Sequence, residues 1–186
     1  MTPLVLAARE DCLECSRLLL AAHAKVNQTT RYGWTPLLAA VQNRHYRLAA
    51  FLLEQGADPN LANHGGWTPL YLAVDNRNIE GGDYPVRQPD MDHLDLIRLL
   101  LDHGANVNAQ LKTQQPYRAK LDRGTDTMLT TGTTPFLRAA KAAVDRASKT
   151  LRDLRIAEVV QLDLQIEDGK VRAYRAKVKV SFKYEG

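Results

Sequence analysis

Cysteine is scarce in this chain, with two residues in 186, Cys12 and Cys15. Two thiolates are too few for a structural zinc site, which takes four ligands. Placed three apart within one predicted helix, the pair has poor geometry for a disulfide. We therefore expect two free, half-buried thiols, the usual state of isolated cysteines in a folded domain.

Long hydrophobic runs are also missing. No window approaches the roughly 18 apolar residues that a membrane span needs, and no basic segment precedes an apolar stretch at the N-terminus. With 45% hydrophobic residues the chain can still bury a core. These features predict a soluble, cytoplasmic protein that does not contact a membrane.

Charge of one sign is in excess only near the C-terminus. Residues 141–186 hold 11 Lys/Arg and 7 Asp/Glu, a surplus of four that accounts for the whole net charge of +4. Aromatic residues make up 6% of the chain, and in this tail the charges alternate with apolar residues. A solvated sheet face is therefore favoured over a nucleic-acid surface.

Catalytic and metal-ligating arrangements are absent from the sequence. It contains no Ser/His/Asp set, no glycine loop that would hold a phosphate and no metal-ligand cluster. The histidines are scattered surface or capping residues: His23, His45, His64, His93 and His103. We expect no enzyme activity, no cofactor and no metal.

What the sequence does contain is a repeat. Thr-Pro-Leu occurs at Thr2, Thr35 and Thr68, in two steps of 33 residues, and Thr134-Pro135-Phe136 begins a fourth unit. Threonine caps a helix and proline starts it with a suitable φ, while Gly56 and Gly104 end the second helices of the second and third units. Each amphipathic helix pair must then stack on its neighbours to bury its apolar face.

One insertion interrupts the third unit, and another separates it from the fourth. Thr68 lies 31 residues before the leucine triplet at Leu99, where the second unit needs 16, so about 15 residues are inserted within 78–92. A further insertion occupies 110–132. Gly81-Gly82-Asp83-Tyr84-Pro85 is expected to be an exposed loop, and tolerated variation explains it as well as a binding role does.

The repeat resembles the ankyrin repeat, a family that binds proteins through its turns and inner helix face. Matching the variable positions of the family motif predicts a protein-binding surface of nine residues: Arg31, Tyr32, Trp34, Gln42, Asn43, His64, Trp67, Asp75 and Asn76. Exposed tryptophan and tyrosine side chains would suit a binding hot spot. Equally, Trp34 and Trp67 could pack against the adjacent turn and stabilise the stack.

The tail departs from this register. From Pro135 to Leu154, apolar residues recur in steps of three and four without glycine or proline, which predicts one continuous helix of about 20 residues. Alternating patterns over 160–166 and 174–184 predict two strands, and Asp168-Gly169 between them favours a tight hairpin turn. One helix on two strands is too little to be stable alone.

The helix and hairpin, from Arg146 to Phe182, resemble dodecin, whose subunits assemble as twelve copies and in many members bind flavin. The flavin-stacking tryptophan of the family falls at Ile156 and its flavin-binding glutamine at Arg175, so the resemblance does not extend to flavin. It is nearer to the calcium-associated dodecins, although Asp163, Glu167 and Asp168 supply too few oxygens for calcium within one chain. The first strand of the family has no counterpart before Pro135.

The expected fold is α+β: an ankyrin-type helical solenoid over residues 1–142 that shares a long helix with a dodecin-like helix and antiparallel β-hairpin over 143–186. A shared helix transmits geometry, which favours an engineered, non-catalytic fusion scaffold. Its tail would drive self-assembly into a homo-oligomer or cage of as many as 12 subunits, and its array would display or bind proteins. Two alternatives stay open: a natural ankyrin adaptor for a protein partner, and a dodecin-like small-molecule carrier.

Overall fold

The computed structural model describes residues 2–78, 87–113, 131–150, 154–167 and 170–182; for residues 78, 142 and those from 144 onward it describes the backbone alone. The chain forms two compact units, Met1–Arg138 and Ala139–Gly186. Among the described residues, no helix has both the length and the apolar character that a bilayer crossing requires.

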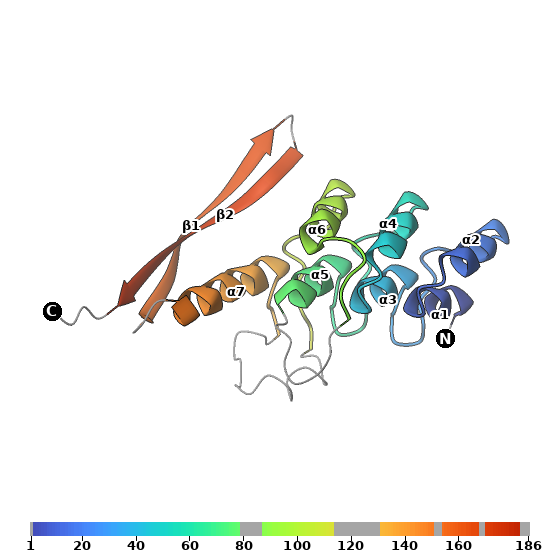
Figure 1. Ribbon diagram of the computed structural model, residues 1–186, viewed down its shortest axis with the longest axis horizontal. Helices are drawn as coiled ribbons and strands as arrows, with labels where there is room; N and C mark the ends of the chain where they lie inside the picture. The colour runs from blue at the N-terminus through green and yellow to red at the C-terminus, as the bar shows by residue number, and fades with distance from the viewer. Residues whose placement is uncertain (1, 79–86, 114–130, 151–153, 168–169, 183–186) are drawn as a thin grey trace. The chain divides into compact units, whose positions relative to one another are not determined.

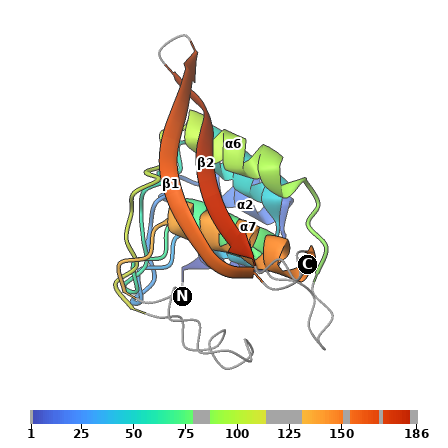
Figure 2. The same cartoon turned by 90° about the vertical axis from the view of Figure 1, so that its left-hand side faces the viewer.

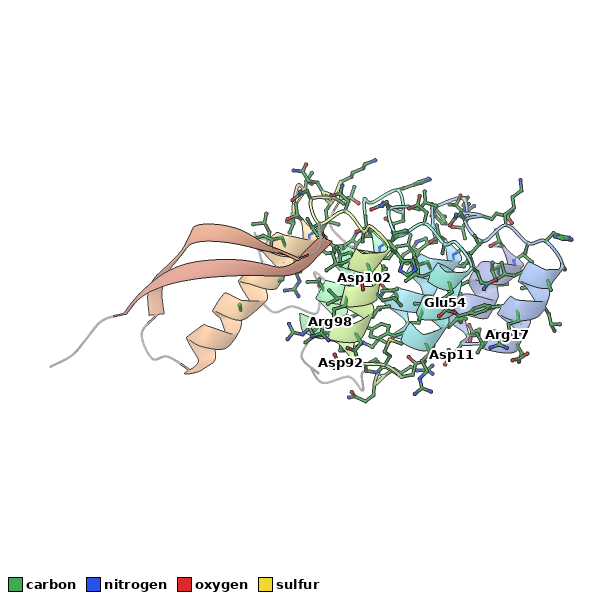
Figure 3. All side chains as sticks on the ribbon, turned by 90° about the horizontal axis from the view of Figure 1, so that it is seen from above. Asp11, Arg17, Glu54, Asp92, Arg98 and Asp102 are labelled. Carbon is green, nitrogen blue, oxygen red and sulfur yellow. A yellow bond between two sulfur atoms is a disulfide. The ribbon has the colours of Figure 1, made fainter. Side chains whose placement is uncertain are left out.

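The first unit is a stack of helix pairs (Figure 1). The pairs are α1 (Pro3–Arg9) with α2 (Leu13–Ala21), α3 (Pro36–Gln42) with α4 (Tyr46–Glu54), and α5 (Pro69–Asn78) with α6 (His93–Asp102). The first helices of the pairs, α1, α3 and α5, lie side by side in one row, and α2, α4 and α6 form a second row. In Figure 3, Glu54 and Asp102 mark corresponding ends of α4 and α6.

The Thr-Pro dipeptides begin helices as the sequence predicts. Each threonine hydroxyl accepts a hydrogen bond from the backbone N–H three residues later, at 3.3 Å for Thr2, 3.1 Å for Thr35, 3.2 Å for Thr68 and 3.2 Å for Thr134. The proline that follows has no N–H to leave unpaired in the first turn. Four copies of one cap therefore start α1, α3, α5 and α7 (Pro135–Thr150).

The core runs along the stack between the two rows of helices. Leu38, Leu52 and Leu72 are fully buried there, and so are Leu96 and Leu100 of α6. Burying one such side chain contributes about 1.5–3 kcal/mol. Since every pair shares this core with its neighbours, the predicted stacking of repeats is confirmed.

The turns after α4 and α6 contain the predicted glycines in left-handed conformation, Gly56 at φ 84° and Gly104 at φ 82°. After α2, His23 takes the equivalent position at φ 63°. Asparagine side chains join successive turns: Asn27 Oδ1 accepts from the Asp58 N–H at 2.9 Å, and Asn60 Oδ1 accepts from the Asn106 N–H at 2.7 Å. The Asn side chains thus fix the spacing of neighbouring repeats.

The end of the first insertion, residues 87–92, binds earlier repeats. The Arg87 guanidinium pairs with Asp11 at 3.0 Å, and Arg44 donates to the Arg87 carbonyl at 3.0 Å. Asp90 Oδ1 accepts from the backbone N–H groups of Tyr46 and Arg47, at 2.7 and 3.1 Å. Asp90 therefore caps α4, whose own N-cap residue makes no side-chain cap bond. The predicted loop at residues 81–85 lies outside the described residues.

The second insertion, over 110–132, is closed at its base by backbone bonds. The Leu111 N–H donates to the Thr133 carbonyl at 3.0 Å, and the Gly132 N–H donates to the Leu111 carbonyl at 2.8 Å. Residues 114–130 between these ends are outside the described residues.

The predicted long helix is unbroken through 141–149, as expected, but it is shorter than the sequence suggested. α7 ends at Thr150, and Leu154 belongs instead to strand β1 (Leu154–Glu167), where it is the register partner of Phe182. The β-branched Ile156, Val159 and Val160 favour extended backbone. The adjacent apolar residues Ile156-Ala157 and Val159-Val160 interrupt the alternating pattern here, so the strand begins earlier than predicted.

Strand β2 (Lys170–Phe182) pairs with β1 in antiparallel register, and the two long strands run side by side in Figure 2. The pairing joins Val159 to Val178 and Glu167 to Lys170, with three irregularities along its length. Within the described residues the two strands form a two-stranded antiparallel sheet. The predicted Asp168-Gly169 turn lies outside the described residues.

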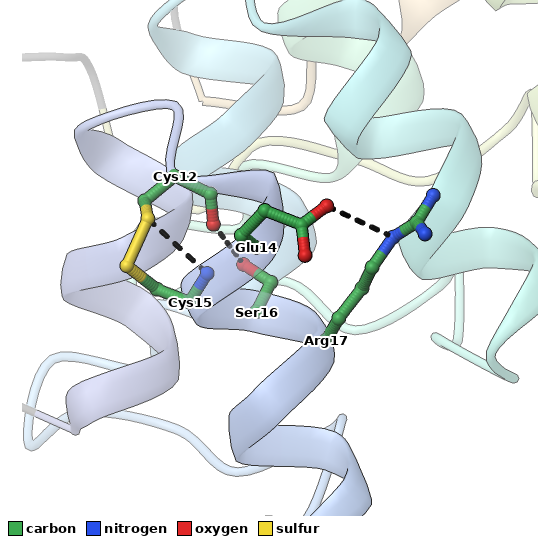
Figure 4. The surroundings of a disulfide bond; sticks show 5 residues. All are labelled: Cys12, Glu14, Cys15, Ser16 and Arg17. Atoms are coloured by element: carbon green, nitrogen blue, oxygen red, sulfur yellow. Dashed lines mark hydrogen bonds and ion pairs between the residues drawn. A yellow bond between two sulfur atoms is a disulfide. The ribbon is translucent and has the colours of Figure 1, made fainter.

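The prediction of free thiols is wrong, because a disulfide joins Cys12 and Cys15. Cys12 lies outside the helix that was expected to contain both. It is the N-cap of α2, at φ −85° and ψ 86°, and Cys15 is in the first turn. The non-helical backbone at Cys12 lets its sulfur reach over the start of the helix to Cys15 (Figure 4).

Candidate protein-binding surface

Hairpin-shaped connections project between successive repeats, and we call them fingers. The first finger is closed by the Thr30 N–H donating to the Trp34 carbonyl at 2.9 Å, and the second by the Asn63 N–H donating to the Trp67 carbonyl at 3.1 Å. The third is closed at Leu111 and Thr133, as described above. Gly33 and Gly66 have φ of 80° at the turns of the first two fingers, a conformation that other residues adopt only with strain.

The fingers contact one another through their backbones. The His64 N–H donates to the Tyr32 carbonyl at 3.1 Å, and the Lys112 N–H donates to the Gly65 carbonyl at 2.9 Å. A Cβ on Gly66 would approach the backbone of residues 110–112 to 2.7–2.8 Å, which is closer than packed atoms allow. These close approaches hold the finger tips in one row.

Arg31, Tyr32 and His64 are the predicted binding residues that the structure exposes at the finger tips. Tyr32 is 56% exposed. The Arg31 guanidinium lies 4.5 Å from the centre of the Tyr32 ring and donates to the Tyr32 hydroxyl. A tyrosine held in place by a cation offers apolar area and hydrogen bonds at low entropic cost, which is typical of binding hot spots.

The tryptophans do not form the exposed strip that one interpretation of the sequence predicted. Trp67 is buried, with 6% of its surface exposed, and its ring packs edge-on against Tyr71 at 4.9 Å. Trp34 is half-buried against the core. The packing interpretation is therefore correct for Trp67, because the third finger covers that face of the second.

Asp75 and Asn76 are buried as well, so their prediction as surface residues is wrong. Asp75 Oδ1 pairs with Arg138 Nε at 2.8 Å, and both side chains are less than a tenth exposed. The Asn76 amide donates to the Val41 carbonyl at 2.7 Å. The start of α7 covers Asp75, and the preceding repeat satisfies Asn76, so both residues hold repeats together.

Gln42 and Asn43, at the end of α3, are half-buried. Asn43 donates to the Ala39 carbonyl at 2.8 Å and is the C-cap of its helix. Gln42 Oε1 is buried without a hydrogen-bond partner among the described residues. Because this oxygen is buried, a protein partner cannot reach it in this conformation.

Two exposed residues that the motif match missed extend the finger row. Lys112 and Thr113 lie at the described base of the third finger and are exposed. They fall in the second insertion, which has no counterpart in the repeat motif, so a match to variable positions could not find them. With Arg31 at the other end, Lys112 gives the row a basic character that suits an acidic partner surface.

No group of three or more His, Cys, Asp or Glu side chains comes together as a metal site within the described part of the chain.

In the hairpin, backbone register places Ile156 opposite Ser181, Asp163 opposite Arg175 and Glu167 opposite Lys170. The two positions where the dodecin resemblance would place flavin-binding residues, Ile156 and Arg175, are therefore not register partners.

Comparison with known proteins finds two families in the chain. A family model for ankyrin repeats in three copies matches residues 4–111, and a dodecin model matches residues 128–185. The calcium dodecin of Mycobacterium tuberculosis (strain ATCC 25618 / H37Rv) is 38% identical over 53 residues, which are 28% of this chain and 75% of that protein. The dodecin match begins ahead of α7.

Proposed function

The chain belongs to the ankyrin-repeat and dodecin families, and from that premise we propose that it is a non-catalytic scaffold whose dodecin domain associates into a homo-oligomer and whose ankyrin array binds proteins. Each copy in the oligomer would then present one array. A partner with several matching sites would gain avidity from simultaneous engagement.

The single observation that carries the association is the hairpin. β1 and β2 are 14 and 13 residues long, and in the described residues they form a sheet of two strands only. A two-stranded sheet is marginal in water, and its outer edges carry unpaired N–H and C=O groups. Pairing or packing with further copies would satisfy both requirements. Twelve copies, the number the dodecin family forms, is the expected assembly.

Protein binding by the array rests on the finger tips. Exposed Tyr32 with Arg31 against its ring, His64 on the next tip and Lys112 beyond it form a row on a backbone-bonded support. Such a support lets side chains bind without first being ordered. The basic ends of the row favour a partner with an acidic surface.

Neither flavin nor calcium fits the hairpin of one chain. Isoleucine at 156 offers no ring on which flavin could stack. The acidic residues Asp163 and Glu167 are register partners of basic residues, and calcium needs six to eight oxygen ligands. Accordingly, the proposed function includes no cofactor.

An engineered origin, which the continuous helix suggested, stays a hypothesis. α7 begins with an ankyrin-type Thr-Pro cap at Thr134, continues unbroken to Thr150 and lies wholly within the dodecin match. The same helix thus starts like the first helix of an ankyrin repeat and belongs to the segment that matches dodecin. A natural gene fusion that kept this helix would produce the same sequence pattern.

The test is light scattering of the full chain over a range of concentrations, beside two variants. Val178→Pro removes a backbone N–H in the middle of β2 and should abolish the oligomer while the array keeps its helical circular dichroism. Tyr32→Ala, a change at an exposed finger tip, should leave the mass unchanged. If the Val178→Pro protein kept the oligomeric mass of the wild type, the array and not the hairpin would carry the self-association, which would contradict the proposal.

A further inference from the structure

The disulfide between Cys12 and Cys15 is the chemically reactive feature that the proposed function does not use. The two residues enclose Leu13 and Glu14 in a Cys-x-x-Cys sequence at the start of α2. The ring that this disulfide closes contains only the first turn of α2. The bond between the two sulfurs can therefore form and break without moving the rest of the helix. The array therefore has a candidate redox site at its first helix pair.

The local hydrogen bonds distinguish the two sulfurs. Cys12 is the N-cap of α2, and its Sγ accepts from the Cys15 N–H at 3.2 Å (Figure 4). The unpaired N–H groups and the dipole at a helix N-terminus stabilise negative charge there. Once the disulfide opens, Cys12 is the sulfur placed to carry that charge, whereas Cys15 lies within the helical turn.

Charged groups around the pair are already engaged. Asp11 Oδ2 lies 3.0 Å from Arg87 and 3.3 Å from the His45 ring, and Glu14 pairs with Arg17 at 3.8 Å. Arg9 and Glu10 pair with each other at 2.8 Å. The acids that would oppose a thiolate at Cys12 thus have cationic or imidazole partners of their own.

Access to the disulfide follows from its position in the stack. Cys15 is exposed, yet Leu48 and Leu96, at the same repeat position in α4 and α6, are 1% and 0% exposed. A small thiol or disulfide can reach the sulfur atoms from solvent.

We propose that Cys12 and Cys15 are a reversible dithiol–disulfide couple, with Cys12 the attacking thiolate and small-molecule disulfides such as oxidised glutathione the reaction partner. The Cys12 thiolate attacks one glutathione sulfur, forming a mixed disulfide and releasing one glutathione thiolate. The Cys15 thiolate then attacks Cys12 Sγ and releases the second. Two electrons pass from the protein to the glutathione disulfide, and the two protons from the protein thiols end on the released glutathione. Reduction by a dithiol reverses both steps.

The experiment uses the full chain, in which no other cysteine can react. The protein is reduced, then equilibrated with oxidised and reduced glutathione, and free thiols are alkylated and counted by mass. We expect complete return to the intramolecular disulfide. The Cys15→Ser variant should accumulate one glutathione adduct at Cys12, and Cys12→Ser should form its adduct at least about threefold more slowly at neutral pH.

A urea-unfolded sample separates a folded-state property from the behaviour of any Cys-x-x-Cys peptide. In urea the two serine variants should form adducts at the same rate, because the helix N-terminus is lost. Equal rates in the folded protein, a faster Cys15, or a wild-type protein that stays a dithiol in oxidised glutathione would each overturn the proposal.

Discussion

At the residue scale, His23 occupies the helix-ending position that glycine fills in the next two repeats. Its φ of 63° is left-handed, and this conformation costs a residue with a side chain about 1–2 kcal/mol. His23→Gly should therefore stabilise the array by about 0.5–1 kcal/mol, the gain being reduced by the greater freedom of glycine in the unfolded chain. Urea unfolding followed by circular dichroism measures the difference.

The matched control is Gly56→Ala, at the equivalent position of the second repeat. A Cβ there would meet nothing within 4 Å, so strain at φ 84° is its only cost. It should destabilise by about 1 kcal/mol. If His23→Gly were also destabilising, the left-handed turn after α2 would not be a strained position.

A second residue prediction concerns pH. Burial, followed by the nearby Arg44, lowers the pKa of His93 below its usual 6.5, although Asp92 partly opposes this. The Tyr46 hydroxyl lies 2.9 Å from His93 Nδ1, so the neutral ring is hydrogen-bonded. As pH falls through 6.5 the unfolded chain takes up the proton first, so stability falls until His93 also protonates in the folded state.

His93→Gln should flatten this dependence, because the amide can accept from Tyr46 but does not titrate. Comparing urea midpoints at pH 7.5 and 5.5 for both proteins isolates the histidine from other titrating groups. Equal losses of stability in the two proteins would show that His93 is not responsible.

At the element scale, α4 depends on a residue from another repeat for its cap. Asp90 accepts two backbone N–H groups at the start of α4, and Asp90→Ala should cost about 1 kcal/mol of unfolding free energy. Asp95→Ala removes an exposed carboxylate whose ion pair among the described residues is with Arg98, along α6. That control should change stability by less than about 0.5 kcal/mol. A similar loss in both variants would argue against the cap.

The start of α7 is joined to α5 by the buried pair of Arg138 and Asp75. Arg138→Met leaves the buried carboxylate without its guanidinium, which should cost about 3 kcal/mol. The double variant Asp75→Leu/Arg138→Met should be more stable than Arg138→Met alone, because it removes both charges. Thermal unfolding of the wild type, the two single variants Asp75→Leu and Arg138→Met, and the double variant decides this. A double variant that loses the sum of both single effects would contradict a direct pairing.

These elements also show which features could be predicted from sequence. The Thr-Pro caps depend on residues three apart, so their helices followed directly from the repeat. The motif match places Asp75 on the surface and cannot reveal its partner, Arg138, which is 63 residues away and follows an insertion. Trp67 was ambiguous for a related reason, since residues 110–113 pack beside it. The disulfide was missed because the exact start of α2, and hence the non-helical backbone of Cys12, does not follow from periodicity.

At the scale of the whole molecule, the account depends on the dodecin domain. The array buries its own core, whereas the described hairpin is a sheet of two strands, an arrangement that is marginal in water by itself. Symmetric closure would make every hairpin equivalent and every array available. In the proposed oligomer, each copy would add one ankyrin array, so that the assembly would present several binding surfaces.

Native mass spectrometry of the full chain at micromolar concentration tests this central claim most directly. The account predicts one discrete assembly of many copies, with twelve as the expected number, and little free subunit. A single species at the mass of one chain, 20.8 kDa, would contradict it.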